Sequence, residues 1–225
     1  MSFLDEKDDI YPILMNTQDN KDYLSRSLHK EISDELTLVY ELRPQNGITM
    51  PVTETMRKYW NVSVEDIHEA AMKNCIEEAT YINAFDTAAF RDGSPGESLM
   101  SAISQEKTLP GVFIISNEDD NGGASVLLAD AVFNSIAGIN ECNLIIVPTS
   151  KDEIIVFKSA DTIIPERVES LNEMLKEINA THVHSEDKIS EQIYVFDKDM
   201  GEVISFNEYT DRFKGIAENL PHIYS

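Results

Sequence analysis

Apolar residues in the second half of the chain follow two periods, one typical of strands and one typical of helices. Short apolar runs of strand length end at polar turns, and a stripe between positions 132 and 137 has the spacing of one helix face. In chain order, the pattern predicts strands over 111–117 and 123–128, a helix over 130–138, strands over 143–147 and 153–158, a helix over 165–179, and a hairpin of 193–197 with 202–206.

The two central runs, Leu144–Val147 and Ile154–Phe157, are continuously apolar, which is typical of strands with both faces covered. Consecutive strands joined by short polar turns favour antiparallel pairing. We therefore predict an α+β fold, with a mainly antiparallel sheet built from hairpins and helices packed on it. Its order is ββα-ββα-ββ over the C-terminal half, and the helices near 130–138 and 165–179 are expected to cover the sheet.

The beginning of the chain shows a weaker pattern. The first ten residues are polar and acidic, and we expect them to fray. After them, Leu24, Leu28 and Ile32 lie at positions i, i+4 and i+8, which is the spacing of one helix face. This spacing predicts a helix over 22–34.

A hairpin is expected next. Residues 36–42 are rich in β-formers, and the turn that follows at 43–47 ends in Asn-Gly, a pair that tolerates positive φ. The return strand is predicted to start at Ile48. Because Pro51 has no N–H to donate, this strand is expected at a sheet edge.

Ser63 then precedes a helical stripe and is predicted to act as its N-cap. The pattern weakens between about 84 and 110, and Asp92–Gly96 is the clearest break in the chain. We therefore predict an N-terminal helix, hairpin and helix region over 1–107 and a C-terminal ββα-ββα-ββ domain over 108–225. One continuous domain is the alternative.

The composition is strongly acidic. Among 225 residues, 41 are Asp or Glu and 18 are Lys or Arg, so the formal net charge is −23. Nucleic acids and anionic membranes are bound through clustered Lys and Arg, and only Arg57-Lys58 approaches such a cluster. We predict no direct nucleic-acid binding and no membrane binding. The acidic residues are dispersed, which favours a solvated surface, and an acidic inhibitor or nucleic-acid mimic is the alternative.

The apolar runs, the N-terminal sequence and the cysteines together predict the cellular compartment. No apolar run approaches the roughly 18 residues of a membrane span, and the acidic start of the chain does not resemble a signal peptide. Cys75 and Cys142 are too far apart to form a metal or redox motif. A cytoplasmic location with reduced thiols is expected.

No cofactor and no metal are predicted. His182 and His184 would share a strand face, but the neighbouring sequence lacks the further spaced Cys or His of a zinc site. The run 117–122 has oxygen side chains like those of a calcium loop, but the twelfth position is Leu128 instead of a carboxylate. The glycine pairs lack the strand and helix context of a phosphate loop.

Several segments of the chain form an ordered set: 11–14, 16–17, 20–21, 29–31, 38–40, 60–63, 70–71, 74, 123–128, 146–153 and 172–183. Together they resemble a bacterial family known as a domain of unknown function and common in anaerobic Gram-positive bacteria. Thr149 stands where this family usually has Ser, and Leu28 where it usually has Pro. Its members usually carry a further N-terminal region, so the resemblance implies a short member or a fragment. It implies no activity, substrate or catalytic residue.

Because no catalytic constellation is visible, we expect a soluble intracellular protein that acts as a non-catalytic binding or regulatory module, with a protein as its partner. One alternative is a hydrolase-type enzyme whose residues assemble only in the fold, around His29 and the Pro148–Glu153 turn. The other is the acidic inhibitor or mimic. A pocket with perturbed titratable groups would favour the enzyme, and a bare apolar patch would favour the binding module.

The strongest candidate site is the polar turn between the two predicted buried strands. Thr149, Ser150 and Glu153 present hydroxyl and carboxyl groups there, and a rigid scaffold that holds a polar loop is a common arrangement for binding. If the turn binds a partner, it should border a concave surface reached by His29 or Asn74. The competing interpretation is a tight turn in which Thr149 or Ser150 hydrogen-bonds its own backbone.

Overall fold

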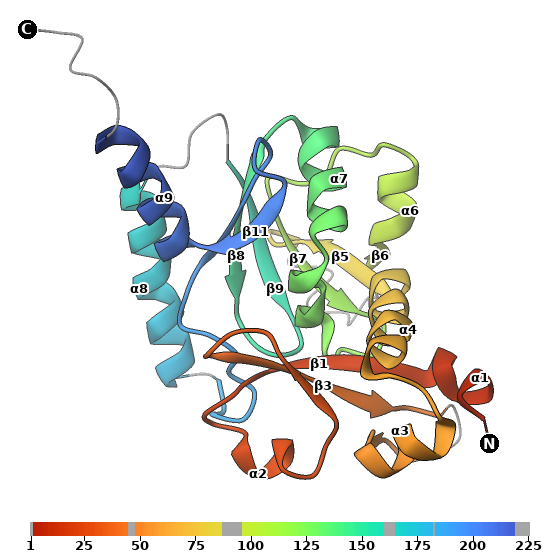
Figure 1. Cartoon of the computed structure of the whole chain (residues 1–225). Helices are drawn as coiled ribbons and strands as arrows, with labels where there is room; N and C mark the ends of the chain where they lie inside the picture. The colour runs from red at the N-terminus through yellow and green to blue at the C-terminus, as the bar shows by residue number, and fades with distance from the viewer. Residues whose placement is uncertain (1, 45–47, 87–95, 160–164, 182, 219–225) are drawn as a thin grey trace, which may run out of the picture.

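The computed structural model describes residues 2–44, 48–86, 96–159, 165–181 and 183–218. Within them the chain forms two antiparallel sheets surrounded by helices (Figure 1). The first sheet contains β1 (Ile10–Asn16), β2 (His29–Glu31), β3 (Leu36–Leu42) and β4 (Met50–Pro51). The second sheet contains β5 (Ala79–Asn83), β6 (Glu97–Ser98), β7 (Val112–Asn117), β8 (Asn143–Pro148), β9 (Ile154–Ser159), β10 (Tyr194–Asp197) and β11 (Glu202–Ser205).

The helices connect and cover these sheets. They are α1 (Phe3–Glu6), η1 (Lys7–Asp9), α2 (Lys21–Leu24), α3 (Glu54–Trp60), α4 (Val64–Glu77), α6 (Leu99–Ser104), η2 (Gly123–Leu128), α7 (Asp130–Asn140), α8 (Pro165–Thr181) and α9 (Phe206–Glu218), where η marks a 3₁₀ helix. Within the described residues, no helix has the length and apolar character needed to cross a membrane.

The second sheet confirms the predicted α+β class. Its strand order is β11-β10-β8-β9-β7-β5-β6, and every neighbouring pair is antiparallel. The predicted hairpins β8–β9 and β10–β11 are both present, with registers such as Ile146↔Val156 and Val195↔Ile204. The helices predicted near 130–138 and 165–179 are α7 and α8, each longer than expected by two residues at its C-terminal end.

Both faces of the central strands are covered, as the apolar runs predict. Leu144 and Ile146 of β8 belong to the core that includes Phe133 of α7, whereas Ile145 and Val147 belong to the core that includes Leu175 of α8. Figure 1 shows α8 and α9 on one side of the second sheet and α7 on the other. Alternate residues of one strand therefore face different cores, which requires a continuously apolar sequence.

The prediction of a strand over 123–128 is wrong, because this segment is the 3₁₀ helix η2. Both edges of β7 are already occupied, by β5 and by β9, so no strand position is free beside it. The segment coils instead and buries Ala124, Val126 and Leu127 in the main core.

Helix η2 also joins the two sheets. Ser125 is fully buried and lies at the free edge of β1, where its Oγ accepts a hydrogen bond from Leu14 N at 3.0 Å and donates one to Pro12 O at 3.0 Å. Gly122 has a φ of +76°, and a Cβ there would lie 2.3 Å from Ile13 Cδ1. The glycine is therefore required both by its backbone conformation and by the close approach of β1.

The prediction of a helix over 22–34 is also wrong. Only α2 is helical there, and His29–Glu31 forms β2, which pairs with β3. Residues 25–27 form a turn and a bend after α2, and Leu28 N donates to Val52 O at 2.7 Å instead of to a helical carbonyl. Pairing with a neighbouring strand outweighs the helical spacing of the apolar residues.

From Ser2 on, the first residues form the short helices α1 and η1, where fraying is expected from the sequence. Ser2 and Asp5 form a capping box on α1, and β1 pairs with β3 along its whole length, from Ile10↔Leu42 to Asn16↔Leu36. The apolar run of β1 was not predicted as a strand, and the same is true of β5.

Other parts of the first half are as predicted. The hairpin of β3 with β4 is present, with the register Glu41↔Pro51, although β4 begins at Met50 and not at Ile48 as predicted. Pro51 lies in a strand that pairs only with β3 among the described residues. Ser63 caps α4, where its Oγ accepts a hydrogen bond from Asp66 N at 3.0 Å. Residues 45–47 of the predicted turn and 92–95 of the predicted break lie outside the described residues.

The division of the chain at residues 107 and 108 stays a prediction. The second sheet includes β5 and β6, which precede this boundary, together with the strands that follow it.

Candidate functional site

The connection between β8 and β9 is a tight turn. Thr149 Oγ1 donates to Glu153 O at 3.1 Å, Ser150 N donates to the same carbonyl at 3.3 Å, and Ser150 Oγ accepts from Asp152 N at 3.1 Å. The hydrogen bonds from Thr149 and Ser150 to the turn's own backbone, which are expected for a tight turn, are therefore present. They fix the positions of the side chains that the turn presents.

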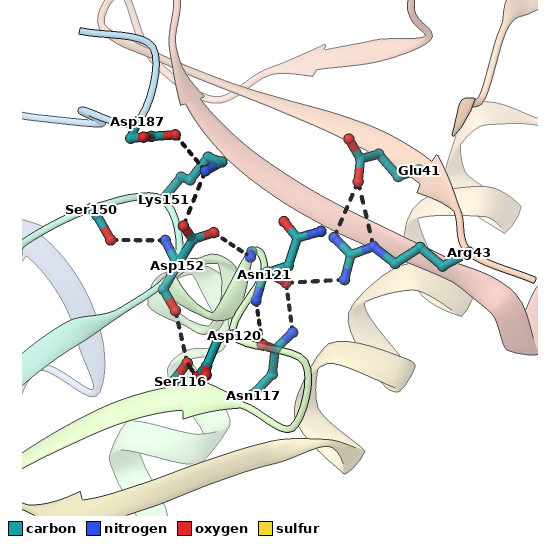
Figure 2. A network of polar contacts seen from close by, with 11 residues as sticks. Glu41, Arg43, Ser116, Asn117, Asp120, Asn121, Ser150, Lys151, Asp152 and Asp187 are labelled. Atoms are coloured by element: carbon teal, nitrogen blue, oxygen red, sulfur yellow. Dashed lines mark hydrogen bonds and ion pairs between the residues drawn. The ribbon is translucent and has the colours of Figure 1, made fainter. Parts of the chain in front are cut away.

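Lys151 ties this turn to the segment that precedes β10. Its Nζ pairs with Asp187 Oδ1 and with Asp152 Oδ2, the latter at 3.0 Å, and its backbone N donates to Asp187 O at 2.7 Å (Figure 2). Burial works against the charge of Lys151, but the two carboxylates outweigh it and raise the pKa of the ammonium group above its ordinary value. The lysine is thus paired with both carboxylates, and the group of three keeps one net negative charge.

Asp152 ties the turn to the start of η2. Its Oδ1 accepts from Gly122 N at 2.9 Å, and its carbonyl accepts from Ser116 Oγ at 3.1 Å (Figure 2). The carbonyl of Lys151 accepts from Ala124 N at 3.2 Å. These bonds fasten the turn to β7 and to the junction between the sheets.

The polar network continues from η2 to the first sheet. Asn117 Nδ2 donates to Asn121 O at 2.6 Å, and Asn117 Oδ1 accepts from Asn121 N at 2.8 Å. Arg43 Nη1 donates to the same carbonyl at 3.0 Å, and its guanidinium pairs with Glu41 at 3.3 Å (Figure 2). The side-chain oxygen of Asn117, which is part of the calcium-loop pattern in the sequence, instead accepts a hydrogen bond that holds the β7–η2 turn.

An open cavity of about 460 Å³ lies beside the turn. Its lining combines polar groups of the turn with apolar side chains and two residues that precede β10: Thr149, Ser150, Asp152, Glu153, Ile155, Ile178, Val183, His184 and Asp187. Open concave surfaces that combine apolar walls with a few fixed polar groups are the usual form of binding sites.

Glu153 is the least compensated acid of this lining. Burial is the main cause that raises the pKa of its carboxyl group, the Thr149 hydroxyl opposes this at 3.2 Å, and the charges of Asp120 and Asp152 raise the pKa further. Glu153 forms no ion pair with any described residue. The cavity therefore carries a half-buried carboxylate in a negative surrounding.

The structure brings together three of the five residues that the sequence suggests. Thr149, Ser150 and Glu153 line one cavity, whereas His29 and Asn74 do not line it. His29 is exposed on β2, with its Nδ1 3.0 Å from Ser27 O. Asn74 is buried and donates from Nδ2 to Lys7 O at 2.8 Å and to Ile10 O at 2.9 Å, so it holds the start of β1 in place.

Sequence reasoning missed the contribution of the segment that precedes β10. The sequence indicates His184 only as a possible metal ligand together with His182, which lies outside the described residues. Within the described part of the chain, no group of at least three His, Cys, Asp or Glu side chains is arranged to hold a metal ion.

Comparison with models of known protein families gives a match over most of the chain. The model of a family of unknown function, DUF5688, matches residues 1–198. No curated protein and no solved structure gives a significant match.

Proposed function

The chain belongs to this family of unknown function, DUF5688, and we propose that it is a non-catalytic binding module that holds a basic segment of another protein in the cavity beside the Thr149–Glu153 turn. The observation that carries this proposal is the half-buried carboxylate of Glu153, which lines the cavity without a described cationic partner. An ammonium or guanidinium group from a partner would supply the missing charge.

The other acids of the cavity do not compete for this role. Asp152 and Asp187 both pair with the single ammonium group of Lys151, so each already has a cationic partner within the protein. Glu153 is left as the acceptor for an incoming cation. Both oxygens of a carboxylate can accept hydrogen bonds, and Thr149 Oγ1 contacts only Oε1.

The apolar part of the cavity suits the stem of a basic side chain. The apolar residues of its lining are Ile155, Ile178 and Val183. Lys and Arg side chains bury their methylene groups against apolar surface while their charged ends reach a polar partner. A lysine or arginine that entered beside Glu153 would satisfy both parts of the lining.

The charge and the rigidity of the protein support the same function. A net charge of −23 attracts cationic partners over a distance and speeds their association at low ionic strength. The turn is already fixed by its contacts to Gly122 and Asp187. Binding there would require little ordering of the backbone, which lowers its entropic cost.

The hydrolase alternative has less support. Ser150 and His184 line the same cavity, but no described hydrogen bond joins Ser150 Oγ to the imidazole of His184. Ser150 Oγ accepts instead from Asp152 N. An activated serine needs a base within hydrogen-bonding reach, held in place by a third group.

The proposal is tested with a fluorescein-labelled heptapeptide, Gly-Ser-Lys-Leu-Lys-Ser-Gly, acetylated and amidated at its ends, and with a counterpart in which Glu replaces both Lys. Fluorescence anisotropy of the full chain should detect binding of the lysine peptide only. Glu153→Gln should weaken that binding about tenfold, the equivalent of about 1.4 kcal/mol.

The matched control is Glu69→Gln, which changes the net charge equally at an exposed position on α4. It should change the affinity less than twofold. Equal weakening by both variants would show that the peptide senses only the overall charge. That result, or the absence of binding by the lysine peptide, would overturn the proposal.

A further inference from the structure

A second cavity, of about 390 Å³, lies where the two sheets meet away from the Thr149–Glu153 turn. The β2–β3 turn of the first sheet contributes one wall, and η2, β10, β11 and the start of α9 contribute the others. It shares no lining residue with the cavity beside Glu153. The two cavities are therefore separate sites.

The floor of this second cavity is apolar. Leu36, Leu127 and Ile204 are almost fully buried beneath it, and Leu128 and Val203 are half-buried at its surface. A volume of this size at the junction of two layers is within the range of small-molecule sites, which usually combine apolar walls with a few fixed polar groups.

The polar wall of the second cavity is acidic. Its described lining residues include Asp34, Glu35 and Glu208 but no Lys, Arg or His. Glu208 pairs with Arg212, whose Nη2 lies 2.6 Å from its carboxylate and whose Nη1 pairs with Glu202. Asp34 and Glu35 line the cavity and form no ion pair with any described residue.

Glu35 is held in a fixed position by neutral donors. Its carboxylate accepts from Ser190 Oγ at 3.1 Å, from Glu191 N at 3.2 Å and from Gln192 Nε2 at 3.1 Å. Hydrogen bonds from three separate donors fix the orientation of the carboxylate. None of these donors carries a positive charge, and Lys188, whose charge also acts on Glu35, is ion-paired with Glu191.

From this combination we infer that the second cavity is a binding site for a small amphipathic organic cation, an alkyl- or arylammonium compound. The apolar part would lie on the floor formed by Leu127, Leu128 and Ile204, and the ammonium group would lie against Glu35 and Asp34. Tyr194, which also lines the cavity, adds an aromatic ring to the wall. This inference is independent of the proposed function at the turn, because the sites share no residue.

The test uses three ligands with the same phenyl group and different charges: 2-phenylethylammonium, 2-phenylethanol and phenylacetate. They are titrated into the full ¹⁵N-labelled chain, and amide shifts are followed by NMR. The ammonium compound should shift the amides of Glu35, Tyr194 and Ile204. It should bind at least tenfold more tightly than the alcohol, and phenylacetate should bind more weakly still.

Variants separate this site from other acidic surfaces. Leu128→Trp should fill the cavity and weaken binding of the ammonium compound at least tenfold, whereas Leu4→Trp, at an exposed position on α1, should change it less than twofold. Glu153→Gln should leave this binding unchanged, which distinguishes it from binding at the turn. If Leu128→Trp does not fold, the ligand series and the shift map of the unaltered chain decide the question.

Three results would overturn the inference. One is the absence of shifts at 10 mM ammonium ligand, and another is equal binding of phenylacetate. The third is a shift map centred on the Thr149–Glu153 turn instead of on Glu35 and Tyr194.

Discussion

Gly123 offers the sharpest test of how the turn is fastened to the rest of the molecule. A Cβ at this position would lie 2.5 Å from Asp152 O and 2.7 Å from the carbonyl carbon of Ser116. Both neighbours are backbone atoms, one in the turn and one in β7, so neither can move aside by a change of rotamer. Gly123→Ala must therefore separate the turn from β7 or distort η2.

The cost can be estimated from the overlap. The distance to Asp152 O is about 0.9 Å short of the 3.4 Å at which ordinary contact begins. Overpacking of a well-packed core costs about 1–3 kcal/mol, and the upper part of this range applies because backbone must move. A loss of about 2–3 kcal/mol should lower the melting temperature by roughly 5–10 °C in a protein of this size.

The assay is thermal and urea unfolding of the purified chain, with Gly138→Ala as the matched control. A Cβ at Gly138 meets no atom within 4 Å, and the residue lies inside α7. Alanine has the higher helix propensity, so the control should gain about 0.5–1 kcal/mol. A Gly123→Ala variant that unfolds within about 0.5 kcal/mol of the unaltered chain, a difference typical of a neutral surface change, would refute this account of the junction.

Three further predictions follow from contacts of the same region. Glu153→Gln should raise the free energy of unfolding at pH 7, because the folded-state pKa of Glu153 is raised and its ionised form is therefore destabilising. The unaltered chain regains this stability as Glu153 is protonated toward pH 4.5, so the advantage of the variant should vanish in acid. Urea titrations across this pH range test the prediction. Ser125→Ala should cost about 1–3 kcal/mol, because two buried backbone groups of β1 lose their partner, and faster hydrogen exchange at the Leu14 amide would report it, whereas unchanged exchange would contradict it. Replacing both Ser150 and Glu153 with Ala should abolish binding of the lysine peptide while the melting temperature stays nearly unchanged; a double variant that binds normally, or that unfolds, would show that the turn is only structural.

The parts of the fold that the sequence predicts well are those stabilised by nearby residues. The β8–β9 and β10–β11 hairpins join strands that are adjacent in sequence across a short polar turn, so pattern and turn chemistry are sufficient. The strand β5 is different, because it pairs with β7 across the break in the pattern, and no local signal indicates that partner. The 3₁₀ helix η2 illustrates a third case, in which the occupied edges of β7 decide the conformation.

The same distinction applies to the candidate site. Thr149, Ser150 and Glu153 could be selected because a polar turn between buried strands is visible in the sequence. Asp187 and His184 join them only because the segment before β10 packs against the turn through Lys151. Asn74 is expected from the sequence to reach the concave surface, yet its amide holds the backbone near β1. Whether a polar residue binds a ligand or its own backbone depends on tertiary neighbours.

The serine that closes the edge of β1 has a consequence for synthesis on the ribosome. Leu14 and Ser125 are 111 residues apart, so at 5–20 residues per second the edge of β1 emerges about 6–22 s before its partner. During that interval the N–H of Leu14 and the carbonyl of Pro12 are open to pairing with another nascent chain. Pro12 itself cannot donate a hydrogen bond and interrupts that edge. Slow translation between these two positions should therefore favour association of unfinished chains, and a proline within the strand limits it.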